Sequence, residues 1–459
     1  MVGVYMGKFI DVDNKTAFLL PPSVDDWLPE DHLARFVEEI VEKLDFSAIE
    51  ETYAGCGKDA YRPQMLMSLL FYGYATGVFS SRKMEQATYD SVAFRYLAGN
   101  THPDHDTIAN FRKKFLKEIR QLFTDILRIA HEMGVLKLGR VSIDGTKLHA
   151  NASKHSALSY KHACELEKKL KAEIEELLKK AEDADASDLP NDLDIPEELK
   201  RREVRVARIQ EAISEIERRS EERYEQEKRE YDEKMKKREA SANAGKKPRG
   251  VAPVPPTPTP LDKDQVNLTD PDSRIMKTSG GGFEQCYNAQ AVVDVESKLI
   301  VSSYVTNHTN DKQEIEPSIQ ELQSLPQEFG RVRSILADTG YYSEANVELC
   351  EFAGIKPFIC MSRDKHNTWL QKQTTPLMPL SVNAGIVERM EHRLKSRRGQ
   401  IIYGKRKTTS EPVFGGIKRG MGFRQFLLRG DEAAGGEWDI VASAWNIRRM
   451  YSLKNIKRG

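Results

Sequence analysis

Three acidic residues, far apart in the chain, have the sequence surroundings of a divalent-metal site. Asp144 follows Val-Ser-Ile and precedes Gly-Thr, and Asp338 follows Ile-Leu-Ala and precedes Thr-Gly-Tyr. Both patterns predict a short strand that ends at the aspartate. Glu411 lies among basic residues directly before Pro412, a residue that favours the first turn of a helix. If this segment is helical, Glu411 and Lys418 lie two turns apart on one face.

Carboxylates in this pattern suit the cleavage of a phosphodiester. Mg²⁺ prefers oxygen ligands, and two such ions about 4 Å apart can activate a water molecule and stabilise the leaving oxygen. Each motif also has an ordinary explanation, because Asp-Gly is a common turn and a glutamate among basic residues is often a surface ion pair. The order, the predicted strand ends and the basic context together favour the catalytic interpretation.

The three motifs resemble those of the DDE-type transposases of bacterial insertion sequences. The similar subgroup has Asp-Gly-Thr, Ala-Asp-x-Gly-Tyr and Tyr-Arg-Glu-Lys motifs, and the resemblance extends over residues 21–429. It implies that Asp144, Asp338 and Glu411 are the catalytic residues. It also implies that these three bind Mg²⁺ or Mn²⁺, with two ions per site.

The third motif departs from the family spacing by one residue. That spacing is tyrosine, two residues, arginine, three residues, glutamate, six residues and lysine. Tyr403 and Arg406 fit its first half, and Glu411 and Lys418 fit its second half. One extra residue places Lys407 where the arginine is expected, so the basic residue is either Arg406 or Lys407. The resemblance implies that Tyr403, Lys418 and this basic residue contact DNA near the cut.

The resemblance also implies a mixed α/β fold with a ribonuclease H-like core, in which helices flank a mixed sheet. Residues 288–294 and 299–305 are rich in strand-forming residues and predict an antiparallel hairpin. Residues 316–325 predict a helix before the strand that ends at Asp338.

Four further aspartates compete for the site. Asp294 lies at the predicted hairpin end and is interpreted as a turn residue. Asp311, in His-Thr-Asn-Asp-Lys, is the best reserve candidate, and the others are Asp270 and Asp272.

The first part of the chain is predicted to be helical. Apolar residues recur at helical spacing over residues 33–44, Pro63 opens a second helix, and Ser81 caps a third that reaches Leu97. A fourth helix follows the turn at residues 99–106, which permits a helix-turn-helix. Its polar face would offer four residues to DNA: Asn110, Arg112, Lys113 and Lys117. Without the resemblance, a generic helical packing domain with solvated lysines is the favoured explanation, and with it, binding of the terminal repeats by this domain is favoured.

A long charged segment interrupts the catalytic region. Apolar residues at three- and four-residue steps between residues 157 and 240 predict an antiparallel coiled-coil hairpin. A proline-rich linker over residues 246–260 follows it. The hairpin is either a dimerisation or end-bridging arm, or a solvated spacer.

Three domains are therefore expected. Residues 1–135 form a helical, DNA-binding domain, and residues 136–156 with 265–459 form the catalytic domain. Residues 157–264 form the inserted hairpin and linker. Residues 365–384 have no periodicity and predict a loop, and a closing helix with Trp438 on its inward face ends the catalytic domain.

The net charge of zero conceals an uneven distribution. Residues 388–429 contain twelve Lys or Arg against three Glu, and residues 165–198 contain thirteen Asp or Glu against five Lys. The basic block overlaps the third motif, where a polyanion is expected to bind. The five cysteines form no CxxC pair, and their odd count without a signal peptide indicates a reducing cytoplasm. The resemblance implies that this is a bacterial cytoplasm, with the protein at the nucleoid. The most apolar run, residues 65–79, is too short for a membrane span.

We expect a transposase that binds the terminal inverted repeats of its element in double-stranded DNA, cuts there, and joins the 3′-hydroxyl ends to target DNA. Because two ends are cut, a homo-oligomer of at least two copies is expected. One alternative is a stand-alone ribonuclease H-like nuclease, which the helical domain and basic block disfavour. The other is a catalytically inactive, transposase-derived DNA-binding protein, which the complete acid set disfavours.

Overall fold

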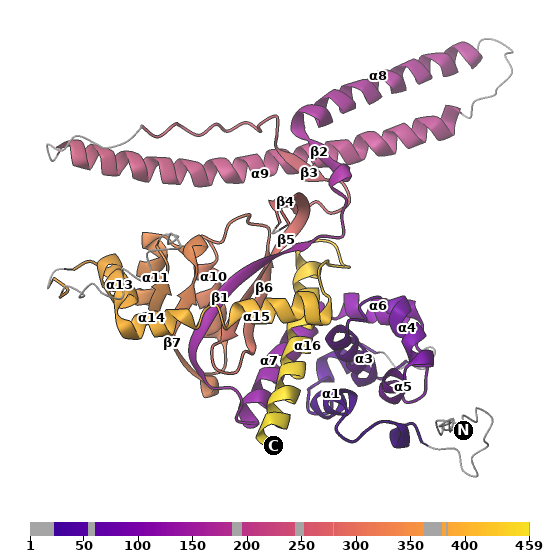
Figure 1. The fold of residues 1–459 in the computed structure, drawn as a ribbon. Coiled ribbons are helices and arrows are strands. Elements are labelled where there is room, and N and C mark those ends of the chain that lie inside the picture. Colours follow the sequence, from indigo (N-terminus) through magenta and orange to yellow (C-terminus); the bar gives the residue numbers. More distant parts are fainter. Residues whose placement is uncertain are drawn as a thin grey trace, which may run out of the picture. The chain divides into compact units, whose positions relative to one another are not determined.

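A computed structural model describes residues 23–53, 60–185, 195–243, 252–278, 280–361, 379–381 and 384–458. The chain forms two compact units (Figure 1). One contains Met1–Val135 together with Ser443–Gly459, and the other contains Leu136–Ala442. Residues 443–459, which we expected in the catalytic domain, therefore belong to the first unit.

The first unit is helical, as predicted. Its first helix buries Phe36, Val37 and Ile40 on the apolar face that the sequence indicates. Pro63 begins the longest apolar helix, which ends at a left-handed Gly77. The helices of this unit before Val135 are η1 (Asp25–Trp27), α1 (Leu33–Val41), α2 (Ser47–Glu50), α3 (Pro63–Thr76), α4 (Ser81–Asp90), α5 (Val92–Leu97), α6 (His105–Lys114) and α7 (Leu116–Glu132).

Two of these helices are shorter than the apolar pattern predicts. The third predicted helix breaks at Ser91, whose extended backbone separates α4 from α5. Ser81 is the first residue of α4 and not its cap, because the extended residue before the helix is Ser80. The fourth predicted helix breaks at Phe115, where the backbone leaves the helical region. A single non-helical residue hardly disturbs apolar spacing, so periodicity does not detect such breaks.

The second unit is built on a six-stranded mixed sheet. Along the sheet the order is β4-β5-β1-β7-β8, and β6 pairs with the β5 edge that also carries β4. β1 pairs antiparallel with β5 and parallel with β7. The predicted hairpin is confirmed as β5 and β6. This sheet makes the fold ribonuclease H-like, and its strands are β1 (Leu138–His149), β4 (Arg274–Lys277), β5 (Phe283–Asp294), β6 (Ile300–Thr306), β7 (Gly330–Ala337) and β8 (Lys356–Ile359).

Helices pack on this sheet and position the third acidic motif. The predicted helix before β7 is confirmed as α10 (Ile315–Ser324). Leu336 of β7 forms a small core with Val295 and Phe358, against which Ile402 and Tyr403 pack. The remaining helices are α11 (Glu344–Phe352), α13 (Ile386–Lys395), α14 (Arg397–Gly404), α15 (Ser410–Gly415), the π-helical segment η5 (Gly416–Met421) and α16 (Asp431–Arg458), with short turns η3 (Gln327–Phe329) and η4 (Thr339–Tyr341).

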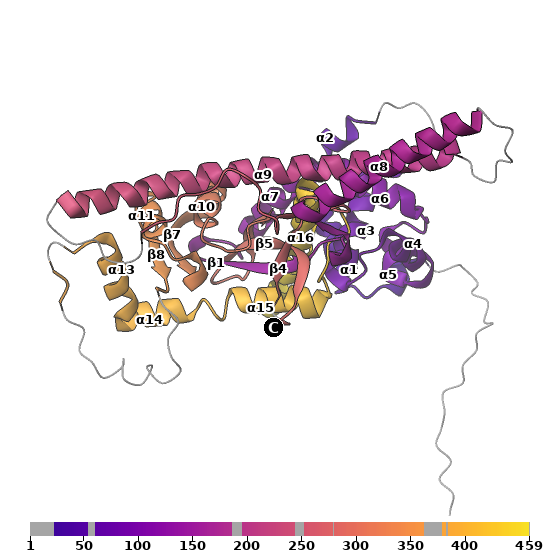
Figure 2. The same ribbon diagram turned by 90° about the horizontal axis from the view of Figure 1, so that it is seen from above.

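The inserted segment forms a helical hairpin, α8 (Tyr160–Asp185) and α9 (Ile195–Asn243), which lie side by side in Figures 1 and 2. Glu173 bonds to Arg202 and Glu167 to Gln210, so the helices run antiparallel as predicted. Their shared core contains Leu170 of α8. A two-stranded sheet of β2 (Ala157–Ser159) and β3 (Gln265–Asn267) closes its base, after the turn η2 (Lys154–Ser156).

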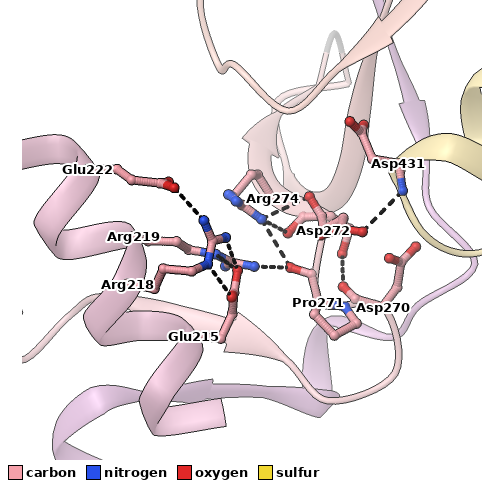
Figure 3. Close-up of polar contacts among 10 residues, drawn as sticks. Glu215, Arg218, Arg219, Glu222, Asp270, Pro271, Asp272, Arg274 and Asp431 are labelled. Atoms are coloured by element: carbon pink, nitrogen blue, oxygen red, sulfur yellow. Dashed lines mark hydrogen bonds and ion pairs between the residues drawn. The ribbon is translucent and has the colours of Figure 1, made fainter. Parts of the chain in front are cut away.

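Arginine side chains join the middle of α9 to the segment that leads into β4 (Figure 3). Arg219 of α9 donates to the Pro271 carbonyl at 2.5 Å, and Arg274 at the start of β4 donates to the same oxygen at 3.0 Å. One residue further on, the Asp272 carboxylate accepts the Asp431 amide at 3.1 Å. Residues 271–274 therefore contact both α9 of the inserted hairpin and the start of α16.

The closing helix α16 begins seven residues earlier than Trp438, at Asp431. Trp438 is fully buried and its Nε1 donates to the Gln290 carbonyl at 2.9 Å, so it packs in the core as predicted.

Most of the loop predicted over residues 365–384 lies outside the described residues. Four cysteines in the described segments are free thiols. Among the helices that the structure describes, none has the length and apolar content for crossing a membrane.

Candidate active site

Asp144 lies in the middle of β1, which corrects the prediction that it ends a strand. β1 continues beyond it because Gly145 and Thr146 still pair with Gln290 and Ala289 of β5. Gly145 permits this pairing, since a Cβ there would lie 2.2 Å from the Gln290 Nε2 atom. The neighbour on the other side, β7, does end near Asp144. The carboxylate therefore lies at a step in the sheet, beside the end of the adjacent strand.

Asp338 follows directly after β7, as predicted. Ser142 of β1 pairs with Leu336 of β7 in a parallel register, which places Asp144 and Asp338 opposite each other two residues further on. The Asp338 Oδ1 atom accepts the Gly340 amide at 2.7 Å and so caps the turn η4. This hydrogen bond fixes the carboxylate at the end of the strand.

The pKa of the Asp144 carboxyl group is raised above its ordinary value. Burial and the neighbouring Asp338 raise its pKa and Arg406 acts in the opposite direction, with a net rise to about 6. Its side chain is only 19% exposed. A buried carboxylate whose ionisation is opposed by a neighbouring carboxylate is typical of a site that a cation neutralises.

Arg406 joins the third motif to the first. Its guanidinium lies 3.8 Å from the Asp144 carboxylate and 3.5 Å from the Glu411 carboxylate. Lys407 is exposed. The extra residue of this chain falls in the turn at residues 405–409 between α14 and α15, where a turn can absorb it. Of the two basic residues that the spacing left open, Arg406 is therefore the one beside the acids.

Glu411 occupies the first turn of α15, as its position before Pro412 predicts. The helix is held against β1, because the hydroxyl groups of Ser142 and Ser410 lie 3.4 Å apart in a buried contact. The Glu411 carboxylate itself is 56% exposed. The third acid thus faces solvent beside two more enclosed ones.

Lys418 and Tyr403 are the remaining residues of the third motif. Lys418 lies in the π-helical segment η5, so the α-helical spacing to Glu411 assumed from sequence is wrong. Its Nζ donates to the Lys147 carbonyl at 3.0 Å, and burial lowers its pKa. Tyr403 is half-buried against Leu336, and burial raises its pKa.

Two polar residues of β5 were missed by the motif reasoning. Asn288 and Gln290 are fully buried and both donate to the carboxylate of Asp311. Their signal in the sequence is two amides that alternate with the alanines of the run Asn-Ala-Gln-Ala, within a buried part of the strand. Asp294 accepts the amide of Ser297 at 2.8 Å, so it is a turn residue as predicted.

Two family models match the chain. A transposase domain family (DUF772) matches residues 22–114, and the transposase DDE domain matches residues 254–447. The chain belongs to the DDE transposases of insertion sequences. No curated protein and no solved structure matches it.

The matched DDE domain contains the second and third acidic motifs of this transposase, and Asp144 precedes it in the chain. The three acids offer only carboxylate oxygens, which are the ligands that Mg²⁺ and Mn²⁺ prefer. Within the described residues, no three His, Cys, Asp or Glu side chains are already close enough to hold an ion. Because Arg406 contacts two of the three carboxylates, an incoming cation and this guanidinium would share the same oxygen atoms. The carboxylate oxygens of the three acids are therefore suitable ligands for Mg²⁺ or Mn²⁺.

Three of the four residues of the helical unit that we predict to contact DNA have exposed side chains. Asn110, Lys113 and Lys117 are exposed. Arg112 is not, which corrects its placement on the polar face. It is 5% exposed, and its Nη1 donates to the Tyr74 hydroxyl at 2.9 Å and to the Phe79 carbonyl. Arg112 therefore holds the helices of this unit together.

Proposed function

We propose that this transposase binds the terminal inverted repeats of its element, cuts at their ends by metal-assisted hydrolysis, and joins the 3′-hydroxyl ends to target DNA. The observation that carries the proposal is the Arg406 contact with Asp144 and Glu411, beside an Asp338 in register with Asp144. These contacts relate acids from three distant segments to one another, which supports the proposal.

Asp144, Asp338 and Glu411 would hold the divalent metal. Bound there, Mg²⁺ supplies Lewis-acid activation of the attacking water and stabilisation of the leaving oxygen. Arg406 offers a planar guanidinium to the scissile phosphate, which it can bind at two oxygens. Lys418 and Tyr403 would contact the DNA on either side of that phosphate.

DNA would lie over the basic surface around this site. Lys395, Arg397, Arg398, Lys407 and Arg419 are exposed on α13, α14, η5 and the turn before α15. Such a surface attracts the phosphate backbone regardless of sequence. Selection of the terminal repeats is assigned to the helical unit, through Asn110, Lys113 and Lys117. Two copies would be needed to cut both ends together.

A strand-cleavage assay tests the function. The purified full chain is incubated with a duplex that ends in the inverted repeats flanking its gene, a circular target and Mg²⁺. Specific nicks at the repeat ends, followed by joined products, are expected, and EDTA should abolish both. Cutting of RNA–DNA hybrids without end preference would favour the nuclease alternative. Specific binding with no cutting in Mg²⁺ or Mn²⁺ would favour the inactive one.

Arg406 and Lys407 should differ sharply when each is replaced by alanine. Arg406→Ala is expected to slow cleavage about a hundredfold, because it removes a charge placed to stabilise the transition state. Lys407→Ala should slow it less than about fivefold, because an exposed ionic contact contributes under about 1 kcal/mol. Single-turnover cleavage rates check this, with end binding and thermal melting as controls. Equal effects of the two substitutions would remove Arg406 from its proposed role.

A further inference from the structure

Asp311 is an acid that the proposed mechanism leaves unused. It lies between β6 and α10, and its Oδ1 accepts from Asn288 Nδ2 at 2.7 Å and from Gln290 Nε2 at 2.9 Å. Gln290 is itself fixed, because its Oε1 accepts the buried Tyr341 hydroxyl at 2.6 Å. Asp311 is thus held by a buried polar network on the central strands.

This network reaches the catalytic aspartates on both sides. A Cβ on Gly145, the residue after Asp144, would lie 2.9 Å from Asp311 Oδ1. A Cβ on Gly340 would lie 2.9 Å from Asp338 Oδ1 and 3.4 Å from Asp311 Oδ2. The Asp338 and Asp311 carboxylates are therefore near neighbours across the η4 turn, and the two glycines leave the space that this approach requires.

A second observation indicates that the network faces a ligand. Asn288 is completely buried, yet its Oδ1 has no hydrogen-bond partner among the described residues. This oxygen would lie 2.8 Å from the same Gly145 Cβ that approaches Asp311. An unpaired buried oxygen beside a carboxylate is costly unless a donor or cation satisfies it.

The charge of Asp311 is not needed for the hydrogen bonds that hold it. Its two donors are neutral amides, which an asparagine oxygen at the same place would satisfy as well. Placing its carboxylate next to that of Asp338 costs free energy through like-charge repulsion, and a divalent cation reverses that cost. Burial lowers the pKa of Lys147 and Asp311 acts in the opposite direction, so Lys147 is the structural counter-charge from which a cation must be distinguished.

We propose that Asp311 is a positioning residue of the active site, a fourth acid that strengthens the binding of a divalent cation at Asp338 and Asp144. The proposal rests on the proposed function for the use of that cation. It differs from a purely structural role in requiring the negative charge and not only an acceptor oxygen.

The test measures Mn²⁺ binding to the full chain by titration calorimetry, apart from any activity. Asp311→Asn keeps the acceptor and removes the charge, and it is expected to weaken Mn²⁺ binding about tenfold or more, the range for residues that support metal ligands. The Mg²⁺ concentration for half-maximal cleavage should rise in parallel. Asp311→Glu should recover most of the affinity. Glu316→Gln is the matched control, because it removes one exposed carboxylate from the same region on α10.

Several outcomes would overturn the proposal. Wild-type Mn²⁺ affinity in Asp311→Asn would do so, as would an absence of Mn²⁺ binding by the wild-type chain. A large loss of thermal stability in Asp311→Asn that Lys147→Met reverses, with unchanged affinity in the double variant, would assign Asp311 to structure instead. If Asp311→Asn does not fold, Asn288→Ser is measured, and an unchanged Mn²⁺ affinity there also overturns it.

The proposed function can fail separately. A wild-type chain that binds Mn²⁺ through Asp311 but cuts no DNA would refute transposition while leaving the role of Asp311 in cation binding intact. A chain that cuts DNA with a Mg²⁺ dependence unaffected by Asp311→Asn would refute only the role of Asp311.

Discussion

Replacement of Asp144 by asparagine is expected to reduce strand cleavage at least about a thousandfold, because residues that act as one catalytic unit cannot substitute for each other. The substitution keeps the size of the side chain and its acceptor oxygen toward the Gly145 amide, 3.0 Å away. Binding of the terminal repeats should therefore change little. Single-turnover cleavage of an end-containing duplex and a gel-shift assay with the same duplex measure the two properties.

Asp294→Asn is the matched control for this prediction. Asp294 is also an aspartate on the central strands, but its carboxylate accepts hydrogen bonds within its own turn, from Glu296 and Ser297. Cleavage by Asp294→Asn is expected to stay within a few times the wild-type rate. Normal cleavage by Asp144→Asn, or an equal loss in both variants, would remove Asp144 from the site.

The same Asp144→Asn variant is expected to be more stable than the wild type at neutral pH in the absence of metal. Burial is the main cause that raises the pKa of Asp144 from 3.8 to about 6 in the folded chain. Protonated Asp144 is therefore favoured by folding, and this contribution is complete below pH 4 and lost as the pH rises through 6. At pH 7 the ionised group costs about 3 kcal/mol, which the neutral amide avoids.

Urea unfolding in EDTA at pH 4 and pH 7 measures this effect. The stability gain of Asp144→Asn should be present at pH 7 and close to zero at pH 4. A gain that is the same at both pH values would mean that the carboxylate of Asp144 is not held in a strained, ionised state. Together the two predictions describe a residue that lowers stability and supports activity, a common relation in active sites.

Much of the fold follows from patterns within short segments. The hairpin of β5 and β6, the helix α10 and the antiparallel arrangement of α8 and α9 agree with apolar spacing. The helix breaks at Ser91 and Phe115 are not visible in this spacing, because one non-helical residue leaves the apolar positions of both flanking helices almost unchanged. The spacing of apolar residues therefore predicted where helices and strands lie better than it predicted where they end.

Individual side chains were harder to place than elements. Arg112 has the spacing of a polar face, yet it donates to Tyr74 of α3 and to the Phe79 carbonyl. Asp144 has the sequence of a strand end, yet its strand continues because β5 offers partners beyond it. In both cases the partner comes from a segment that is distant in sequence, so the local residues do not indicate it.

The amino-acid sequence by itself determined the family, the mixed α/β class and the three acidic motifs, because these depend on residue types and on spacings of a few residues. Only the tertiary structure decided that Arg406, and not Lys407, lies between Asp144 and Glu411. It alone brought Asp311 beside Asp338. The physical reason is that such contacts depend on strand register and on turns that absorb an extra residue, which arise only when distant segments pack together.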